Sequence, residues 1–430
     1  MSGPADRGWG AGGSAPGDFY RPEIQTLSRE EIVSIQETRL RDLVARVFDQ
    51  PVPFFKRKLE AAGVGPDDVK TLDDLHRVPT TTKGELRESE AANPPLGDYR
   101  GAPLERCIRL GTSTGTTGRP TIMLFTRHDL DVEHDAAARM FWRQGYRPGD
   151  VVTHAHPGGL YGGQALLGGA LEAFGALNVA VGPPVSRADA ERAIALWKEL
   201  RPTGYEMFGP PRHLFWDTAI EMGLDPREDL GMPEPDEVIP WRTFSAGIEC
   251  FAFLGSSCGH SQGSHLCEDE AIVEVIDPAT GDPVAEGERG HEVVTTLTKD
   301  NFMLRYDLQD VVRLDRSGCP CGETHARGFW DGRAADLVRA GDRDLLPIDV
   351  SEALADVPEV SRPALEFQMV RTADPGALRL RVETPDPNAT LRARVAGLLT
   401  ERLGVPAEID LVETGALPRP AYKPARVVDE

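Results

Sequence analysis

The run Gly111–Arg119, within LGTSTGTTGRPT, contains five Ser or Thr residues and three Gly residues. Glycines let a backbone approach an anion closely, and successive N–H groups can surround phosphate oxygens. The hydroxyl groups add hydrogen-bond donors and can contact Mg²⁺. The run lacks the GK[ST] ending of a Walker sequence. It predicts a phosphate-binding loop, with a hydrophilic surface loop as the alternative, and the flanking strand-like segments CIRLG and TIMLF favour the first.

One lysine stands in the C-terminal sequence GALPRPAYKPARVVDE. After Lys299 the only lysine is Lys423, although arginine is frequent there. Lysine is a compact point charge, whereas arginine is a planar fork. A lone lysine in a Pro-punctuated loop is consistent with a need for that point charge, and chance placement of a mobile surface residue is the alternative.

Most of the six cysteines lie between residues 250 and 321, together with histidines. Soft sulfur and nitrogen ligands without a carboxylate predict a closed, tetrahedral structural Zn²⁺ site. His260 and His325 compete with His265 for the histidine position, and reduced, unligated thiols are the alternative to a metal. The preferred Cys₃His set is Cys258, His265, Cys319 and Cys321.

The elements that must position these groups follow an α/β pattern. Residues 29–48 and 187–200 have helical apolar spacing, and residues 105–182 alternate strand-like and helical runs. Residues 271–298 alternate with period two around turn residues, which predicts antiparallel strands. After the GRAADLV segment, two strands, a helix and a further strand predict a small α+β domain of about 100 residues.

The size and the charge of the chain limit the classes of function that it can have. The chain has 430 residues and a formal net charge of −22, which argues against nucleic acid or an anionic membrane as the main partner. No apolar run approaches the roughly 20 residues that span a bilayer. The first 18 residues are rich in Gly, Ala, Pro and Ser and have no signal core, so we expect a disordered tail over 1–18 and a cytoplasmic protein.

Six segments, in order along the chain, resemble the adenylate-forming enzymes and specifically their phenylacetate–coenzyme A ligase branch. Besides the hydroxyl-rich loop these are residues 254–298, LRYDLQDVVRL at 304–314, CPCG at 319–322, GRAADLV at 332–338 and LPRPAYKPARVVD at 417–429. Each segment alone is a weak signal. Their shared order over about 320 residues makes the resemblance specific.

The resemblance implies a large N-terminal adenylate-forming α/β domain over 19–332, with the zinc-binding insertion. A smaller, mobile α+β domain over 333–430 then rotates between half-reactions. The implied reaction joins a carboxylate to ATP–Mg²⁺, releases pyrophosphate, and passes the acyl group from the adenylate to a thiol, usually coenzyme A. The expected partners are therefore ATP, a small acid and coenzyme A, and a homodimer is left open.

The resemblance also implies roles for single residues. It makes Lys423, Glu249 and Thr116 the catalytic residues, with Lys423 neutralising charge at the α-phosphate and Glu249 near Mg²⁺. Asp310 accepts hydrogen bonds from the ribose, with a surface ion pair to Arg305 or Arg313 as the alternative, and Arg333 adds ribose or phosphate contacts. The implied phosphate contacts are Ser113, Thr114, Gly115, Thr116, Thr117 and Gly118.

The segment HAHPGGLYGG at 154–163 corresponds to the family's acyl pocket. The resemblance places His156, Tyr161 and Gly162 against the substrate. Aromatic walls favour flat aryl acids, and a histidine can bond a ring hydroxyl or amine. We therefore expect a substituted benzoate or arylacetate, with ordinary core histidines as the alternative.

Two departures from the family leave the second half-reaction open. The region 230–250 is short, so SAGIE can match either the adenine-binding turn or the element that carries the magnesium-proximal Glu249. The hinge has Ala335, with Asp336 next, where relatives have Asp two residues after the Arg. The alternatives are an aryl-AMP ligase that serves a carrier protein or an amine in secondary metabolism, and a catalytically weakened zinc-containing binding protein.

Overall fold

The computed structural model describes residues 13–49, 52–113, 120–156, 160, 162–207, 210–235, 243–244, 246–361, 365–373, 375–418 and 426–430. The chain forms two compact units. The first comprises Met1–Leu308 with Arg313–Phe329, and the second comprises Gln309–Val312 with Trp330–Glu430. The mixed α/β architecture is the fold class expected from the sequence.

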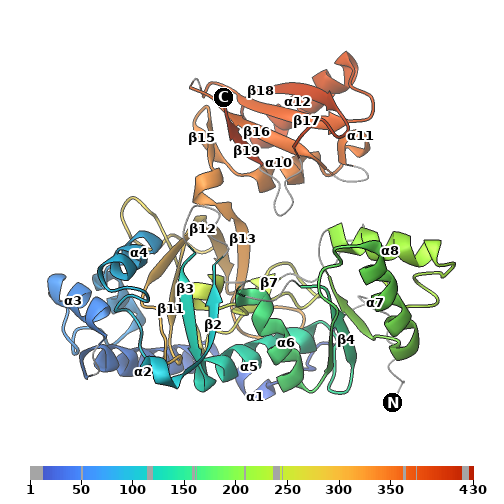
Figure 1. Ribbon diagram of the computed structural model, residues 1–430. Coiled ribbons are helices and arrows are strands. Elements are labelled where there is room, and N and C mark those ends of the chain that lie inside the picture. Colours follow the sequence, from blue (N-terminus) through green and yellow to red (C-terminus); the bar gives the residue numbers. More distant parts are fainter. Residues whose placement is uncertain are drawn as a thin grey trace. The chain divides into compact units, whose positions relative to one another are not determined.

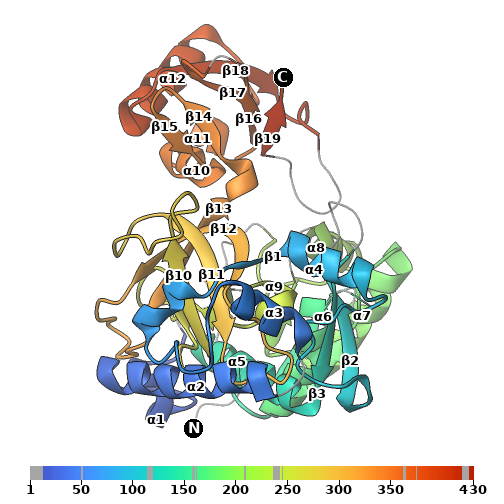
Figure 2. The same ribbon diagram turned by 90° about the vertical axis from the view of Figure 1, so that its left-hand side faces the viewer.

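The first unit begins with helices that pack beside its sheet (Figure 2). The apolar spacing predicted over 29–48 is confirmed, because Ile32, Leu40, Leu43 and Val47 are buried, whereas Ile35 is only half-buried. These first elements are α1 (Pro22–Gln25), α2 (Arg29–Asp49), α3 (Pro53–Ala61), η2 (Leu72–Arg77), β1 (Thr81–Thr82), α4 (Lys83–Ala92) and η3 (Leu104–Arg106).

The middle of the unit contains an antiparallel hairpin and a parallel sheet ordered β5-β4-β6 (Figure 1). Ser186 caps the predicted helix over 187–200 by accepting a hydrogen bond from Asp189 N. The elements are β2 (Cys107–Thr112), β3 (Ile122–Thr126), α5 (Arg127–Arg143), β4 (Val151–His154), α6 (Gly162–Phe174), β5 (Leu177–Ala180), α7 (Arg187–Leu200), β6 (Gly204–Glu206) and α8 (Pro210–Glu221).

A larger sheet, ordered β10-β11-β12-β13-β9-β8-β7, follows, with β1 paired to β12. The antiparallel pair predicted over 271–298 is confirmed, with Ala271 opposite Thr296. Its elements are β7 (Thr243–Phe244), α9 (Gly247–Cys250), β8 (Gly255–Ser256), β9 (Ser264–Leu266), β10 (Ala271–Ile276), β11 (Gly290–Thr296), β12 (Tyr306–Asp315) and β13 (Arg327–Arg333).

The second unit has its own apolar core between helices and a sheet ordered β18-β17-β16-β19 (Figure 1). The predicted order of two strands, a helix and a strand is confirmed, and the terminal strand β19 joins β16 in parallel. Its elements are η4 (Ala334–Asp336), β14 (Val338–Ala340), β15 (Arg343–Leu345), α10 (Pro347–Leu354), α11 (Pro358–Ser361), β16 (Phe367–Arg371), β17 (Leu378–Thr384), α12 (Ala389–Leu403), β18 (Ala407–Glu413) and β19 (Val427–Asp429).

Part of the expected disordered tail contacts the folded unit. Ser14 is buried and its N–H donates to Arg143 O at 3.1 Å. Asp18 pairs with Arg147 at 2.5 Å. Composition predicted disorder over 1–18, but hydrogen bonds and an ion pair order the described end of this segment. Within the described residues, none of the helices combines the length and apolar character that a membrane span requires.

Candidate functional site

The hydroxyl-rich loop lies between two paired strands, as the sequence suggested. Thr112 of β2 lies opposite Ile122 of β3. At the neck of the loop, Ser113 N donates to Thr121 O at 3.1 Å and Thr121 N donates to Ser113 Oγ at 3.0 Å. Ser113 therefore closes the loop as well as bordering it. The predicted phosphate contacts Thr114, Gly115, Thr116, Thr117 and Gly118 lie outside the described residues.

The neck of this loop is hydrogen-bonded to Leu160, in the second half of the predicted acyl segment. Both the backbone N–H and the hydroxyl of Thr112 donate to Leu160 O, at 2.7 and 3.1 Å. Residues 112 and 160 belong to segments that sequence analysis gave different tasks, ATP binding and acid binding. Among the described residues, these two hydrogen bonds are the contact that joins the two segments at Thr112 and Leu160.

Glu249 is buried on the short helix α9, which packs against β2 and β3. Gly247 precedes it with a φ of +68°, and a Cβ there would lie 2.9 Å from Glu249 Oε2. The left-handed backbone favours glycine at this position in SAGIE, and a larger residue would also crowd the Glu249 carboxylate in its present position. The local sequence thus positions Glu249 beside the strands that hold the phosphate-loop candidate.

Lys83 is a site residue that the sequence analysis missed. It opens α4, and its Nζ lies 2.8 Å from Glu249 Oε1. Glu90 on the same helix accepts hydrogen bonds from Tyr99 Oη at 2.9 Å and from Ile122 N at 3.4 Å. The ammonium group of Lys83 thus places a positive charge beside the buried carboxylate of Glu249. The signal that could have found it is a lysine directly after TTT, at a capped helix start.

Asp310 and Arg333, both in the second unit, form an ion pair with Nε and Oδ1 3.7 Å apart. The alternative partner Arg305 is engaged elsewhere, because its guanidinium pairs with Glu274 at 2.9 Å. The guanidinium of Arg313 lies 5.0 Å from the ring centre of Phe329. The structure thus brings together the two residues that the resemblance linked to the nucleotide. Lys423 lies outside the described residues.

The acyl segment begins at His154, the last residue of β4, and a second histidine, His156, follows two residues later. The rings of His154 and His156 have centroids 5.5 Å apart. Burial and, to a smaller extent, the charge of His154 together lower the pKa of His156 to about 4. His156 is therefore a neutral hydrogen-bonding group near pH 7. Tyr161 lies outside the described residues, and Gly162 begins helix α6.

Four predicted metal ligands come together between the loop after β8 and the CPCG loop. The ligand atoms of Cys258, His265, Cys319 and Cys321 all lie within 4.8 Å of one another. The sulfur atoms of Cys258 and Cys319 are 3.6 Å apart, and Cys321 Sγ is 3.4 Å from His265 Nε2. Three thiols and one imidazole in this arrangement fit a tetrahedral Zn²⁺ ion.

The orientation of His265 also fits a metal ligand. Its Nδ1 lies 3.0 Å from the carbonyl oxygen of His325 and donates to it, which leaves Nε2 facing the sulfur atoms. The rival His260 instead lies 2.7 Å from Ser14 O. The pKa of Cys258 is lowered to about 2, first by a hydrogen bond from the Cys321 thiol, against the effect of burial, and further by His265. A thiolate is the form that binds metal.

A buried ion pair anchors the chain directly after the CPCG loop. Arg143, at the end of α5, pairs with Glu323 through Nη2 at 2.5 Å and Nε at 2.9 Å. Its Nη1 also donates to Ser256 Oγ at 2.9 Å. One arginine therefore joins α5 to both loops that carry the metal-ligand candidates.

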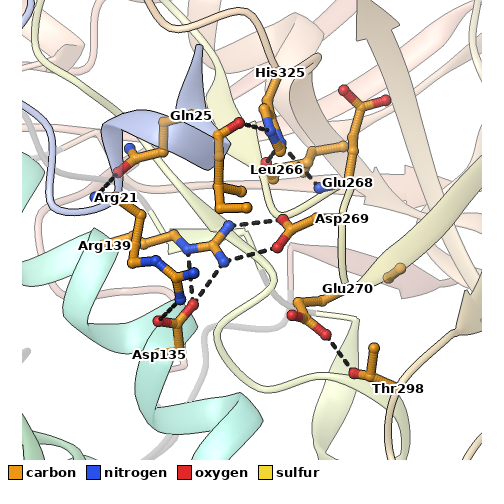
Figure 3. Close-up of polar contacts among 12 residues, drawn as sticks. Arg21, Gln25, Asp135, Arg139, Leu266, Glu268, Asp269, Glu270, Thr298 and His325 are labelled. Atoms are coloured by element: carbon orange, nitrogen blue, oxygen red, sulfur yellow. Dashed lines mark hydrogen bonds and ion pairs between the residues drawn. The ribbon is translucent and has the colours of Figure 1, made fainter. Parts of the chain in front are cut away.

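The acidic turn Glu268–Glu270, which follows β9, is held by Arg139 (Figure 3). Asp269 accepts two hydrogen bonds from Arg139, at 2.7 and 2.8 Å, and Asp135 accepts from Arg139 Nε at 3.0 Å. Glu268 N donates to His325 Nδ1 at 3.1 Å. His325, the rival candidate for the metal ligand, is thus hydrogen-bonded to the backbone. Asp269 links the turn after β9 to Arg139 of α5.

Comparison with known proteins identifies the family. No protein-family model matches the chain. A phenylacetate–coenzyme A ligase of Thermus thermophilus is 33% identical over 442 residues, covering 93% of this chain and 97% of the relative. A crystal structure of 2-hydroxyisobutyryl-CoA ligase in the postadenylation state with 2-HIB-AMP matches with a TM-score of 0.80 and 27% identity, covering 95% of this chain and 92% of that one.

The same ligase in complex with 2-HIB-AMP and CoA in the thioesterification state matches with a TM-score of 0.67 and 27% identity, covering 100% of this chain and 94% of that one. The relative and the solved structures are thus all acyl–coenzyme A ligases. The chain belongs to the phenylacetate–coenzyme A ligase family and is an ATP-dependent, AMP-forming acid ligase.

Proposed function

We propose that this ligase activates an aromatic carboxylic acid, a substituted benzoate or an arylacetate, as its acyl-adenylate and then transfers the acyl group to coenzyme A. The observation that carries this proposal is the pair of hydrogen bonds from Thr112 to Leu160 O, which joins the phosphate-loop candidate to the acyl segment. A carboxylate bound at that segment lies next to the loop that would hold the ATP phosphates.

Each half of the proposal has support from a similar protein. The Thermus relative is named for phenylacetate, an aromatic acid. The 2-hydroxyisobutyryl-CoA ligase is bound to its acyl-adenylate together with CoA, which supports the second half-reaction. In this chain the imidazole of His156 supplies a flat, neutral wall for an aryl group.

The residues divide the chemistry as follows. The substrate carboxylate attacks the α-phosphate of ATP, the bond to pyrophosphate breaks, and the acyl-adenylate forms. Lys423 neutralises charge on the α-phosphate, and the residues Ser113–Gly118 hold the leaving pyrophosphate. Glu249 would hold Mg²⁺, which lowers the negative charge of the phosphates when bound. Asp310 and Arg333 bind the ribose. The thiol of coenzyme A then displaces AMP.

The metal-ligand candidates have a separate, structural role in this proposal. Cys258, His265, Cys319 and Cys321 would hold Zn²⁺, which cross-links the loop after β8 to the CPCG loop. All four protein ligands are present, so the site has no open position for a substrate.

ATP–pyrophosphate exchange with a panel of acids tests the first half-reaction. We expect exchange with benzoates and arylacetates and little with alkyl or fatty acids of similar size. Faster exchange with fatty acids would refute the aromatic substrate. An absence of exchange with every acid would favour the weakened binding protein.

The acceptor is tested by product analysis with and without coenzyme A. We expect an aryl-CoA thioester when coenzyme A is present. The alternative, an aryl-AMP ligase for a carrier protein or an amine, is favoured by the hinge, where Ala335 replaces the acidic residue. Release of free aryl-AMP with no thioester in the presence of coenzyme A would select that alternative.

A further inference from the structure

We propose that Glu206, at the end of β6, is a specificity-determining residue that selects aromatic acids bearing a ring hydroxyl or amino group. This inference rests on the proposed function, because it assigns a second polar group beside the acyl segment, at the strand end that is in register with His154. Sequence analysis did not single out Glu206.

The topology of the parallel sheet places Glu206 at a ligand-binding edge. β4 is central, β5 lies on one side of it and β6 on the other. The winding of the chain therefore reverses between β4 and β6. In sheets of this kind, ligands bind outside the carboxyl ends of the strands at that reversal. His154 and Glu206 are register partners at those ends, and His156 follows two residues later.

The register also fixes which face of the sheet carries Glu206. Directly paired residues on adjacent strands point to the same face, so Glu206 shares its face with His154. The opposite face is filled by core residues: Trp197 Nε1 donates to Thr153 Oγ1 at 2.9 Å and the ring of Trp197 lies 5.4 Å from that of Tyr205. His154 and Glu206 thus lie on the face opposite to the one that packs against Trp197.

Glu206 has a single hydrogen-bond donor from a side chain within the described part of the protein. Tyr146 Oη donates to Glu206 Oε1 at 2.9 Å. A Cβ on Gly204 would lie 2.3 Å from the ring of Tyr146, so the glycine makes room for this tyrosine. The side chain of Glu206 is also intermediate in solvent exposure. The second carboxyl oxygen is therefore the group that a substrate donor would reach.

The charge state of the pocket suits a neutral ring substituent. Burial raises the pKa of Glu206, against the effect of the Tyr146 hydrogen bond, and burial lowers the pKa of His156. Both shifts favour uncharged groups. A smaller share of the ionised form of Glu206 weakens its repulsion of the substrate carboxylate, and both side chains still form hydrogen bonds. A substrate that lacks a donor would leave a carboxyl oxygen desolvated and unpaired, which disfavours its binding.

The test compares matched acids in ATP–pyrophosphate exchange: benzoate with hydroxy- and aminobenzoates, and phenylacetate with its hydroxy and amino forms. We expect the wild type to favour the donor-bearing acids by about tenfold in kcat/KM, the effect of one hydrogen bond. Glu206→Leu should abolish this preference by lowering kcat/KM for the donor-bearing acids alone. The KM for ATP should stay unchanged. Glu206→Gln keeps a carbonyl acceptor and should keep part of the preference.

Two further variants separate selection from stability. Glu199→Leu makes the same change on the exposed face of α7 and should alter neither the preference nor the melting temperature. Tyr146→Phe removes the protein's own donor but leaves Glu206 in place, so the preference should persist. If the pair serves stability alone, Tyr146→Phe and Glu206→Leu will both lower the melting temperature and leave the preference unchanged.

The outcomes distinguish this inference from the proposed function. Two results overturn the role of Glu206 and leave the proposed function standing. One is exchange with aromatic acids in which the wild type shows no preference for donor-bearing acids. The other is a preference in Glu206→Leu and Glu206→Gln that equals that of the wild type. Faster exchange with alkyl acids than with any aromatic acid overturns the proposed function and this inference together.

Discussion

At the scale of single residues, the two carboxylates that the resemblance assigns to the ATP site, Glu249 and Asp310, have very different surroundings. Glu249 is buried and has a lysine 2.8 Å away. Asp310 faces Arg333 at 3.7 Å, and the side chain of Arg333 is 51% exposed. An exposed pair of this kind contributes about 0–1 kcal/mol to stability. Any large effect of changing Asp310 should therefore appear in ligand binding and not in folding.

We expect Asp310→Asn to raise the KM for ATP by about tenfold, because an amide accepts hydrogen bonds from the ribose less well than a carboxylate does. The melting temperature should change little. Steady-state exchange at varied ATP, alongside thermal unfolding, checks both. Asp336→Asn, three residues beyond Arg333, is the matched control and should leave the KM for ATP unchanged. An unchanged KM in Asp310→Asn would remove Asp310 from the nucleotide site.

At the scale of elements, α5 is the helix that holds the sheet and the metal-ligand loops together. Arg139 joins it to the acidic turn through Asp269, and Arg143 joins it to the CPCG loop through Glu323. All four side chains are buried. Removing one partner of a buried pair leaves an uncompensated charge, which typically costs about 3–5 kcal/mol.

The contribution of Asp269 to the free energy of unfolding should depend on pH. Burial opposes its ionisation, but the hydrogen bonds and charge of Arg139 outweigh burial and lower the pKa of Asp269 to about 2. The unfolded pKa is about 3.9. The stabilisation is therefore complete above about pH 4 and is lost as pH falls toward 2. Urea unfolding should show that Asp269→Asn costs about 3–5 kcal/mol at pH 7 and less at pH 3.

The control for this experiment is Asp282→Asn, in the exposed turn between β10 and β11. Its cost should be small at both pH values. A cost for Asp269→Asn that is equal at pH 7 and pH 3 would contradict the assigned role of the ionised carboxylate.

The metal-ligand candidates act between elements, so their removal should weaken the fold. We expect purified protein to hold one Zn²⁺ per chain, and Cys258→Ser to lose most of it and to melt at a lower temperature, because structural zinc contributes directly to folding. Cys267→Ser replaces a buried thiol outside the four-residue set and should keep the metal. Metal analysis with thermal unfolding checks both variants. Equal metal content in the two variants would refute the assignment.

At the scale of the whole molecule, two units with separate cores divide the predicted catalytic residues. Glu249 and Ser113 belong to the first unit, whereas Asp310, Arg333 and the sequence around Lys423 belong to the second. Each unit is folded by its own apolar contacts. A change in a catalytic residue of the second unit can therefore abolish the reaction without disturbing the core of either unit.

We expect Lys423→Ala to reduce ATP–pyrophosphate exchange at least about a hundredfold, because a point charge that stabilises the transition state is lost. Lys198→Ala on α7 is the control and should leave exchange unchanged. Circular dichroism and the melting temperature should match the wild type in both variants. Near-normal exchange in Lys423→Ala would refute its role.

Much of the architecture follows from local sequence. Apolar spacing with period two correctly predicted the antiparallel pair over 271–298, and helical apolar spacing correctly predicted the helices over 29–48 and 187–200. These predictions succeed because an element that buries one face has apolar residues at regular intervals along the chain. The composition rule failed at Ser14 and Asp18, since order there comes from contacts with distant α5 and Arg147, which composition does not encode.

By itself, the sequence determined the element types, the family resemblance and the residue types available for chemistry. It also named the four members of the cysteine and histidine cluster, because two short runs, CGHSQGSH and CPCG, carry unusual ligand types. Only the tertiary structure decided that Lys83 faces Glu249, 166 residues away, and that Glu206 lies beside His154. These pairings arise from strand register and helix packing, which bring together residues with no periodic relation in sequence.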